Sequence, residues 1–175
     1  MIITLEELFQ SFVDASYREL LSTARESVRR LIPVFDEIVN EPREQLIERA
    51  NDSIDKLTYY LNDIEAKPIA QIVLDIIFTT IAVDGRFSKA EYYFICQILD
   101  IESSYEDVKR MVEERYTNEG MRTLIDTFYD CVFDNDDIRY DFSVLVLCIL
   151  AADDEISNEE VSFFIRLLNQ KNGND

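Results

Sequence analysis

The sequence predicts an all-α fold, in which a compact helical bundle follows a long N-terminal helical hairpin. Only three glycines and three prolines interrupt 175 residues, which suits long helices better than a β fold with many turns. A hydrophobic content of 47% is enough for a substantial core. One turn motif, Asp-x-x-(Phe/Ile)-Ser-x-x-Glu, occurs twice, at Asp84–Glu91 and Asp153–Glu160, each time between an apolar and an amphipathic stretch. We therefore expect two similar helix–turn–helix units.

The first predicted helix begins at a capping box, Thr4-Leu5-Glu6-Glu7, whose hydroxyl and carboxylate satisfy free N–H groups. Apolar residues then recur every three or four positions as far as Leu31, which indicates one buried stripe. Pro33 is expected to stop or kink this helix, because proline lacks an N–H and clashes with the preceding turn.

A second helix is predicted from Pro42, since proline is tolerated in a first helical turn. Its apolar positions alternate steps of three and four, a pattern typical of packing against a partner helix: Ile47, Ala50, Ile54, Leu57, Leu61 and Ile64. The partner is either the first helix, in an intramolecular hairpin, or another molecule. Residues 1–66 are thus a predicted N-terminal hairpin and a possible dimer or partner surface.

Pro68 opens a third predicted helix and marks the domain boundary. Ile72–Val83 is almost wholly apolar or small, so this helix should be buried nearly all round. The second domain, 67–171, should continue with helices at about 89–99, 105–116, 120–133, 138–152 and 158–170, for three of which serines are placed as N-caps: Ser88, Ser104 and Ser157. Residues 172–175 form a predicted disordered tail.

Most of the repeated turn has a structural explanation. Gly85 suits the left-handed position that ends a helix. Ser88 with Glu91, and Ser157 with Glu160, match capping boxes. In each copy the hydrophobic residue before the serine, Phe87 or Ile156, could staple onto the residue four places into the next helix, Tyr92 or Val161.

The leading aspartate of each copy, Asp84 and Asp153, is left unexplained. It falls at the C-terminal end of a helix, where free carbonyls disfavour another anion. Compensation must come from an N–H of the turn, from a nearby arginine such as Arg86, or from a bound cation.

Residues 81–91 read Ile-Ala-Val-Asp-Gly-Arg-Phe-Ser-Lys-Ala-Glu. This run resembles the signature of tellurite-resistance TerB-like domains, roughly A-x-D-G-x-φ-S-x-x-E with φ hydrophobic, which that family repeats in a weaker second copy. The resemblance covers about Pro68–Gln170. It implies a compact helical bundle with paired acidic turns, found in bacterial stress-response and tellurite-resistance systems and proposed to bind metal or to act as an interaction module.

Carried over by position, the acidic residues of that signature are Asp84, Glu91, Asp153 and Glu160. The second turn departs from the family in having Asp154 where glycine is usual. Residues 1–66 have no counterpart in the minimal domain. The resemblance therefore implies the domain type, and tellurite itself does not follow from it.

Charge and composition narrow the possible functions. The chain has 36 acidic and 17 basic residues, a net charge of −19 and no histidine. Such a charge repels nucleic acid and anionic lipid surfaces and attracts cations and basic partners. Without histidine, Ser-His-Asp and Cys-His catalysis and His-rich metal sites are excluded, and no phosphate-binding glycine motif is present.

The N-terminus lacks the features of a signal peptide, and the longest apolar run, Val144–Ala152, is too short to cross a bilayer. A cytoplasmic, soluble protein is therefore expected. The cysteines lie among apolar neighbours and are interpreted as core thiols: Cys96, Cys131 and Cys148. The acidic run 134–137 is interpreted as a solvated turn.

These observations favour a non-catalytic binding or adaptor protein, with a protein partner or self-association through the N-terminal helices. The alternative is a divalent-cation module, in which Asp84, Glu91, Asp153 and Glu160 supply oxygens to calcium or magnesium. The motif is not an EF-hand, because it spans eight residues rather than twelve. Structural capping is the favoured role of the two glutamates, and an enzyme is the least favoured function.

Overall fold

The computed structural model describes residues 26–62, 69–114, 135–153 and 156–168. Seven α-helices pack together in these ranges, and no strand occurs among them. The helices are α3 (Glu26–Val39), α4 (Arg43–Asn62), α5 (Ile69–Ile81), α6 (Lys89–Leu99), α7 (Tyr105–Glu113), α9 (Asp136–Leu150) and α10 (Asn158–Leu168). A short 3-10 helix, η1 (Ala82–Asp84), follows α5. The all-α prediction is confirmed.

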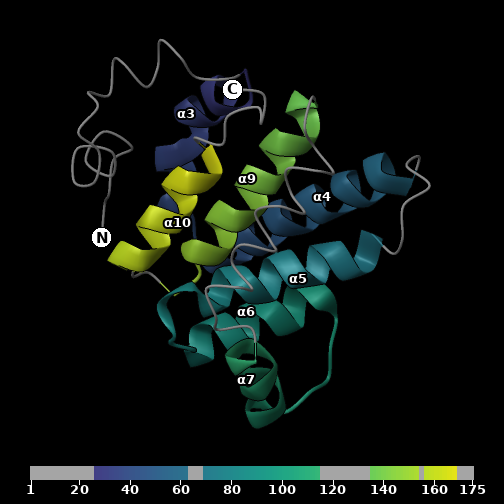
Figure 1. Ribbon diagram of the computed structural model, residues 1–175, viewed down its shortest axis with the longest axis vertical. Helices are drawn as coiled ribbons and strands as arrows, with labels where there is room; N and C mark the ends of the chain where they lie inside the picture. Colours follow the sequence, from purple (N-terminus) through teal and green to yellow (C-terminus); the bar gives the residue numbers. More distant parts are fainter. Residues whose placement is uncertain (1–25, 63–68, 115–134, 154–155, 169–175) are drawn as a thin grey trace, which may run out of the picture.

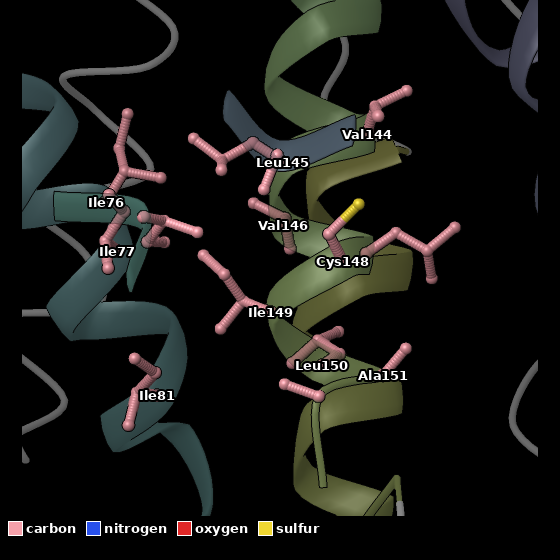
Figure 2. Packing of buried hydrophobic residues seen from close by; sticks show 14 of the residues in the cluster. Ile76, Ile77, Ile81, Val144, Leu145, Val146, Cys148, Ile149, Leu150 and Ala151 are labelled. Carbon is pink, nitrogen blue, oxygen red and sulfur yellow. The ribbon is translucent and has the colours of Figure 1, made fainter. Parts of the chain in front are cut away.

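Helix α9 forms the centre of the bundle, and α3, α4, α5 and α10 pack against it (Figure 1). Every residue from Asp141 to Leu150 is buried. In Figure 2, Leu145 and Ile149 of α9 point toward α5, whereas Val144, Cys148 and Ala151 lie on the other side of α9. The two apolar helices that precede the repeated turns, α5 and α9, therefore pack against each other.

Helix α3 runs through Pro33, so this proline does not stop the helix, and the predicted alternative of a kink stays a prediction. Leu31, Phe35 and Ile38 are fully buried on one face of α3, which packs against α9. Pro33 lies on the exposed side together with Arg29, whose carbonyl loses its helical N–H partner but remains open to water. Burial of the apolar face outweighs the loss of that one hydrogen bond.

Helix α4 begins directly after Pro42, as predicted. It packs chiefly against α9 and also contacts α5 and α6. Its buried positions are Leu46, Ala50, Ser53 and Leu57, whereas Ile47 and Ile54 of the predicted seam are only half-buried. The main partner of this seam is therefore α9, in the second half of the chain, rather than the first helix alone.

Helices α5, α6, α7 and α10 begin where the sequence predicts. α5 follows Pro68, and residues 76–83 are buried without interruption. α6 and α7 begin after Ser88 and Ser104, whose side chains accept hydrogen bonds from the backbone N–H groups of Glu91 and Asp107. The predicted Thr4–Glu7 capping box, the 120–133 helix and the C-terminal tail lie outside the described residues.

The described part of the predicted solvated turn at 134–137, residues 135–137, is instead the start of α9. The Asn135 side chain accepts hydrogen bonds of 3.0 and 3.1 Å from the N–H groups of Asp137 and Ile138, and so caps α9. Within the described ranges, none of the helices has the length and apolar content needed to cross a bilayer.

Candidate functional site

The first repeated turn joins η1 to α6. Gly85 adopts a left-handed backbone conformation, with φ 71° and ψ 12°, and its N–H donates to the Ala82 carbonyl. The Oδ1 atom of Asp84 accepts a 2.8 Å hydrogen bond from the backbone N–H of Arg86. Of the three compensations considered for Asp84, the structure therefore provides an N–H of the turn.

The glutamate that ends the first motif is a buried capping residue. Glu91 Oε2 accepts a 2.7 Å hydrogen bond from the Ser88 N–H, and the Glu91 N–H donates to Ser88 Oγ at 3.1 Å. Both halves of the predicted capping box are thus present. Only 4% of Glu91 is exposed, a burial that its place in a polar motif does not predict.

The second copy repeats this arrangement. Glu160 Oε2 accepts a 2.6 Å hydrogen bond from the Ser157 N–H, and the Glu160 N–H donates to Ser157 Oγ at 3.2 Å. Glu160 is 3% exposed. Asp153 is half-buried at the end of the preceding turn, and residues 154–155 lie outside the described part of the chain.

The two turns influence each other electrostatically. Burial raises the pKa of Glu91 to about 7, although the hydrogen bonds from Ser88 oppose the shift, and the charges of Asp153 and Asp84 raise it further. Burial likewise raises the pKa of Glu160 to about 8 against its hydrogen bonds from Ser157, with Asp84 and Asp153 adding to the rise. We call the two turns, with the carboxyl groups of Asp84, Glu91, Asp153 and Glu160, the paired turns.

Contacts between η1 and α10 bring the paired turns into one region. Across the described ranges, however, no three carboxylate, thiol or imidazole side chains are grouped closely enough to hold a metal ion. In addition, one oxygen each of Asp84, Glu91 and Glu160 already accepts a backbone hydrogen bond. The capping role of the two glutamates is confirmed, and the predicted cation ligation by all four residues stays a prediction.

An aromatic cluster that the sequence reasoning missed holds the first turn against α7. The Phe87 ring stacks on Tyr105 with centroids 5.4 Å apart, and the Tyr105 hydroxyl donates to the Phe87 carbonyl at 2.8 Å. Tyr105 also meets Tyr92 edge-on at 5.5 Å. Phe87 thus contacts α7 as well as lying near the helix it was predicted to staple. The matching prediction for Ile156 depends on the Val161 side chain, which is outside the described ones.

The cysteines carry no site in the described residues. Cys148 is buried in the core, and this burial raises the pKa of its thiol to about 12. Such a thiol stays protonated and unreactive, so the core interpretation is confirmed for Cys148. Cys96 is only half-buried, and Cys131 lies outside the described residues.

A second candidate site is an open groove of about 930 Å³ on the outer side of α3 and α4. We call it the acidic groove, because six carboxylates line it: Glu37, Glu41, Glu44, Glu48, Asp52 and Asp55. Arg49 is its one basic lining residue and pairs with Glu37 at 2.7 Å and with Glu41. These two acids raise the pKa of the Arg49 guanidinium above its usual value.

Sequence reasoning also missed the acidic groove. Part of the acidic groove can nevertheless be read from the sequence. Four acidic residues follow steps of four and three on one helix, which places them on one face: Glu44, Glu48, Asp52 and Asp55. That α3 adds Glu37 to the same hollow depends on how the two helices pack.

No protein-family model, no curated protein and no solved structure matches this chain.

Proposed function

We propose that this chain is a non-catalytic binding protein, an adaptor that captures a positively charged segment of another protein in its acidic groove. The observation that carries the proposal is the composition of this hollow, in which six carboxylates face one guanidinium. Opposite charges across an interface speed association and select the partner. The overall charge of −19 adds long-range attraction for a basic partner.

The distribution of ion pairs within the groove supports this proposal. Arg49 is engaged by Glu37 and Glu41, and Lys56 pairs with Asp52 at 2.6 Å. The described residues give Glu44, Glu48 and Asp55 no ion pair. Three carboxylates along α4 are thus available to a basic partner, and half-buried Ile47 provides an apolar contact among them.

Self-association through the same groove is disfavoured, because two copies would bring like charges together. The partner is therefore a different, basic protein. For residues 67–171 the proposal includes a TerB-like domain with two helix–turn–helix units, supported by the resemblance of residues 81–91 and by the two matching capping boxes. A role in bacterial stress response or tellurite resistance rests on that resemblance alone.

Binding of a fluorescein-labelled amphipathic Lys/Leu peptide, followed by anisotropy at low and moderate salt, tests the groove. Glu48→Lys with Asp55→Lys should weaken binding at least tenfold, because both residues are exposed at mid-helix in the groove. Glu102→Lys with Glu114→Lys is the matched control, since these exposed residues lie outside the groove and change the net charge equally. Equal weakening by both variants would mean that net charge alone attracts the peptide, and the groove proposal would fail.

A second candidate function is binding of a divalent cation at the paired turns, supported by the shared electrostatic field of Asp84, Glu91, Asp153 and Glu160. A cation there would offset the burial that raises the pKa of both glutamates and the repulsion from Asp84 and Asp153 that adds to the rise. Melting temperature should be followed during titration with calcium and magnesium, since a ligand at 100 times its Kd stabilises the folded form by about 2.7 kcal/mol. An identical shift in wild type and in Asp84→Asn with Asp153→Asn would exclude these turns as the site.

A further inference from the structure

The first two turns of α9 connect both N-terminal helices to the rest of the bundle. Arg30 of α3 pairs with Asp137 at 2.5 Å and stacks over the Tyr140 ring, with the guanidinium carbon 4.4 Å from the centroid. Both partners of the ion pair are largely exposed. One turn further along α9, Asp141 is 5% exposed. On α9, the buried carboxyl group of Asp141 therefore follows, one turn later, the exposed ion pair that joins α9 to α3.

The charges that act on Asp141 come from both N-terminal helices. Lys56 and Asp52 act from α4, and Arg30 acts from α3. Asp137 of α9 itself adds a negative charge. Helices α5 and α10 also pack against α9, but the charges that shift the pKa of this carboxyl most come from α3, α4 and α9. Asp141 is thus sensitive to how α3 and α4 are seated.

Burial outweighs the two cations. Removal from water raises the pKa of Asp141 to about 6, although Lys56 and Arg30 lower it, and Asp52 and Asp137 raise it further. The charged carboxylate is therefore poorly accommodated in the packed bundle, and the neutral acid is well accommodated.

We propose that Asp141 is a proton-controlled latch, which holds α3 and α4 against α9 more firmly when its carboxyl group is protonated than when it is charged. Releasing α3 and α4 would return this group to water, where the charged form is stable. Raising the pH therefore loosens the contact between the N-terminal helices and α9. This inference is independent of the proposed partner and of the paired turns.

The size of the effect follows from proton linkage. A group with a pKa of 3.8 in water and about 6 when packed binds its proton more tightly in the packed state. The packing equilibrium should then favour the docked helices about tenfold more at pH 5 than at pH 8. The direction of this pH dependence follows from the sign of the pKa shift. A raised carboxyl pKa stabilises the packed form at low pH, and this stabilisation is lost as the pH rises through about 6.

Hydrogen exchange of the full chain, read by mass spectrometry between pH 5 and pH 8 and corrected for intrinsic rates, tests the latch. Amides of α3 and α4 should gain about tenfold more protection from pH 8 to pH 5 in the wild type than in Asp141→Asn, whose side chain is neutral at every pH. The comparison cancels the titration of Glu91 and Glu160, which both proteins share. Asp55→Asn serves as the matched control, because it removes an exposed carboxylate of α4 and should leave the wild-type gain unchanged.

Lys56→Met provides a second variant if Asp141→Asn does not fold. Loss of a cation that lowers the pKa of Asp141 should move the midpoint of the pH dependence upward. Equal gains in protection in the wild type and in Asp141→Asn, or a midpoint that is unchanged in Lys56→Met, would overturn the proposal.

Discussion

Glu91 of the first turn and Asp153 of the second are electrostatically coupled, because the charge of Asp153 raises the pKa of Glu91. The relation is reciprocal between the copies, since Asp84 of the first turn raises the pKa of Glu160 in the second. Packing of α5 on α9 and of α10 on η1 brings the turns together. Each capping box is favourable locally, but folding buries both glutamates in the field of the same two aspartates, which disfavours their charged forms.

The buried glutamates should make the protein more stable in mild acid than at alkaline pH. A carboxyl group whose folded pKa is raised stabilises the folded state below its unfolded pKa, and this contribution is lost as the pH rises through the folded value. With pKa values of about 7 for Glu91 and about 8 for Glu160, the free energy of unfolding should fall by roughly 4 kcal/mol at most between pH 6 and pH 8.5.

Urea unfolding at several pH values, followed by circular dichroism, measures the slope of the free energy of unfolding against pH. Glu91→Gln with Glu160→Gln should flatten it, because glutamine keeps the capping hydrogen bonds without the charge. The exposed pair Glu48→Gln with Glu102→Gln is the control, and its slope should match the wild type. An unchanged slope in the buried pair would show that these carboxyls do not titrate as described.

The role of Asp84 is separable into its hydrogen bond and its charge. Asp84→Asn keeps an oxygen that can accept from the Arg86 N–H, and it removes an anion from a helix C-terminus. Asp84→Ala removes the acceptor as well and should be about 1 kcal/mol less stable than the asparagine variant. Chemical denaturation at pH 7 measures both. Equal stability of the two variants would mean that the hydrogen bond contributes nothing.

Gly85 should be the residue of the first turn that tolerates substitution least. Its φ of 71° lies in the left-handed region, where a Cβ atom costs roughly 1–2 kcal/mol. Gly85→Ala should therefore lower the free energy of unfolding by that amount, and Gly85→Asn by less, because asparagine tolerates this conformation. The same loss in both variants would indicate that the free space around Gly85, rather than its backbone angle, matters.

The contact between α5 and α9 should dominate the stability of the bundle. Ile77 and Ile149 are 0% and 2% exposed and lie on α5 and α9, which pack against each other (Figure 2). Each change to alanine should cost about 2–5 kcal/mol, and the double variant should deviate from additivity by at least about 0.5 kcal/mol, since neighbouring cavities share lining atoms. Exposed Met111→Ala is the control, expected within about 0.5 kcal/mol of wild type. Strict additivity in thermal or urea unfolding would contradict direct contact.

Local chemistry made several helix starts predictable. The serines that precede α6, α7 and α10 accept hydrogen bonds from N–H groups of the next turn. Pro42 and Pro68 favour the starts of α4 and α5 because proline has a fixed φ and no N–H that needs a partner. None of these effects depends on the rest of the fold. The left-handed Gly85 and both capping boxes follow for the same reason. Pro33 is the exception, because burial of α3 against α9 overrides a local helix breaker.

The sequence by itself therefore determined the helical class, several of the helix starts and the capping roles of Glu91 and Glu160. Only the tertiary structure decided that these glutamates are buried in the field of Asp84 and Asp153, that Asp141 of α9 is buried within reach of charges on α3 and α4, and that the acids of α3 and α4 line one groove. The physical reason is the distance along the chain over which each interaction acts. Capping acts over three or four residues, whereas desolvation and charge coupling depend on which distant helices become neighbours.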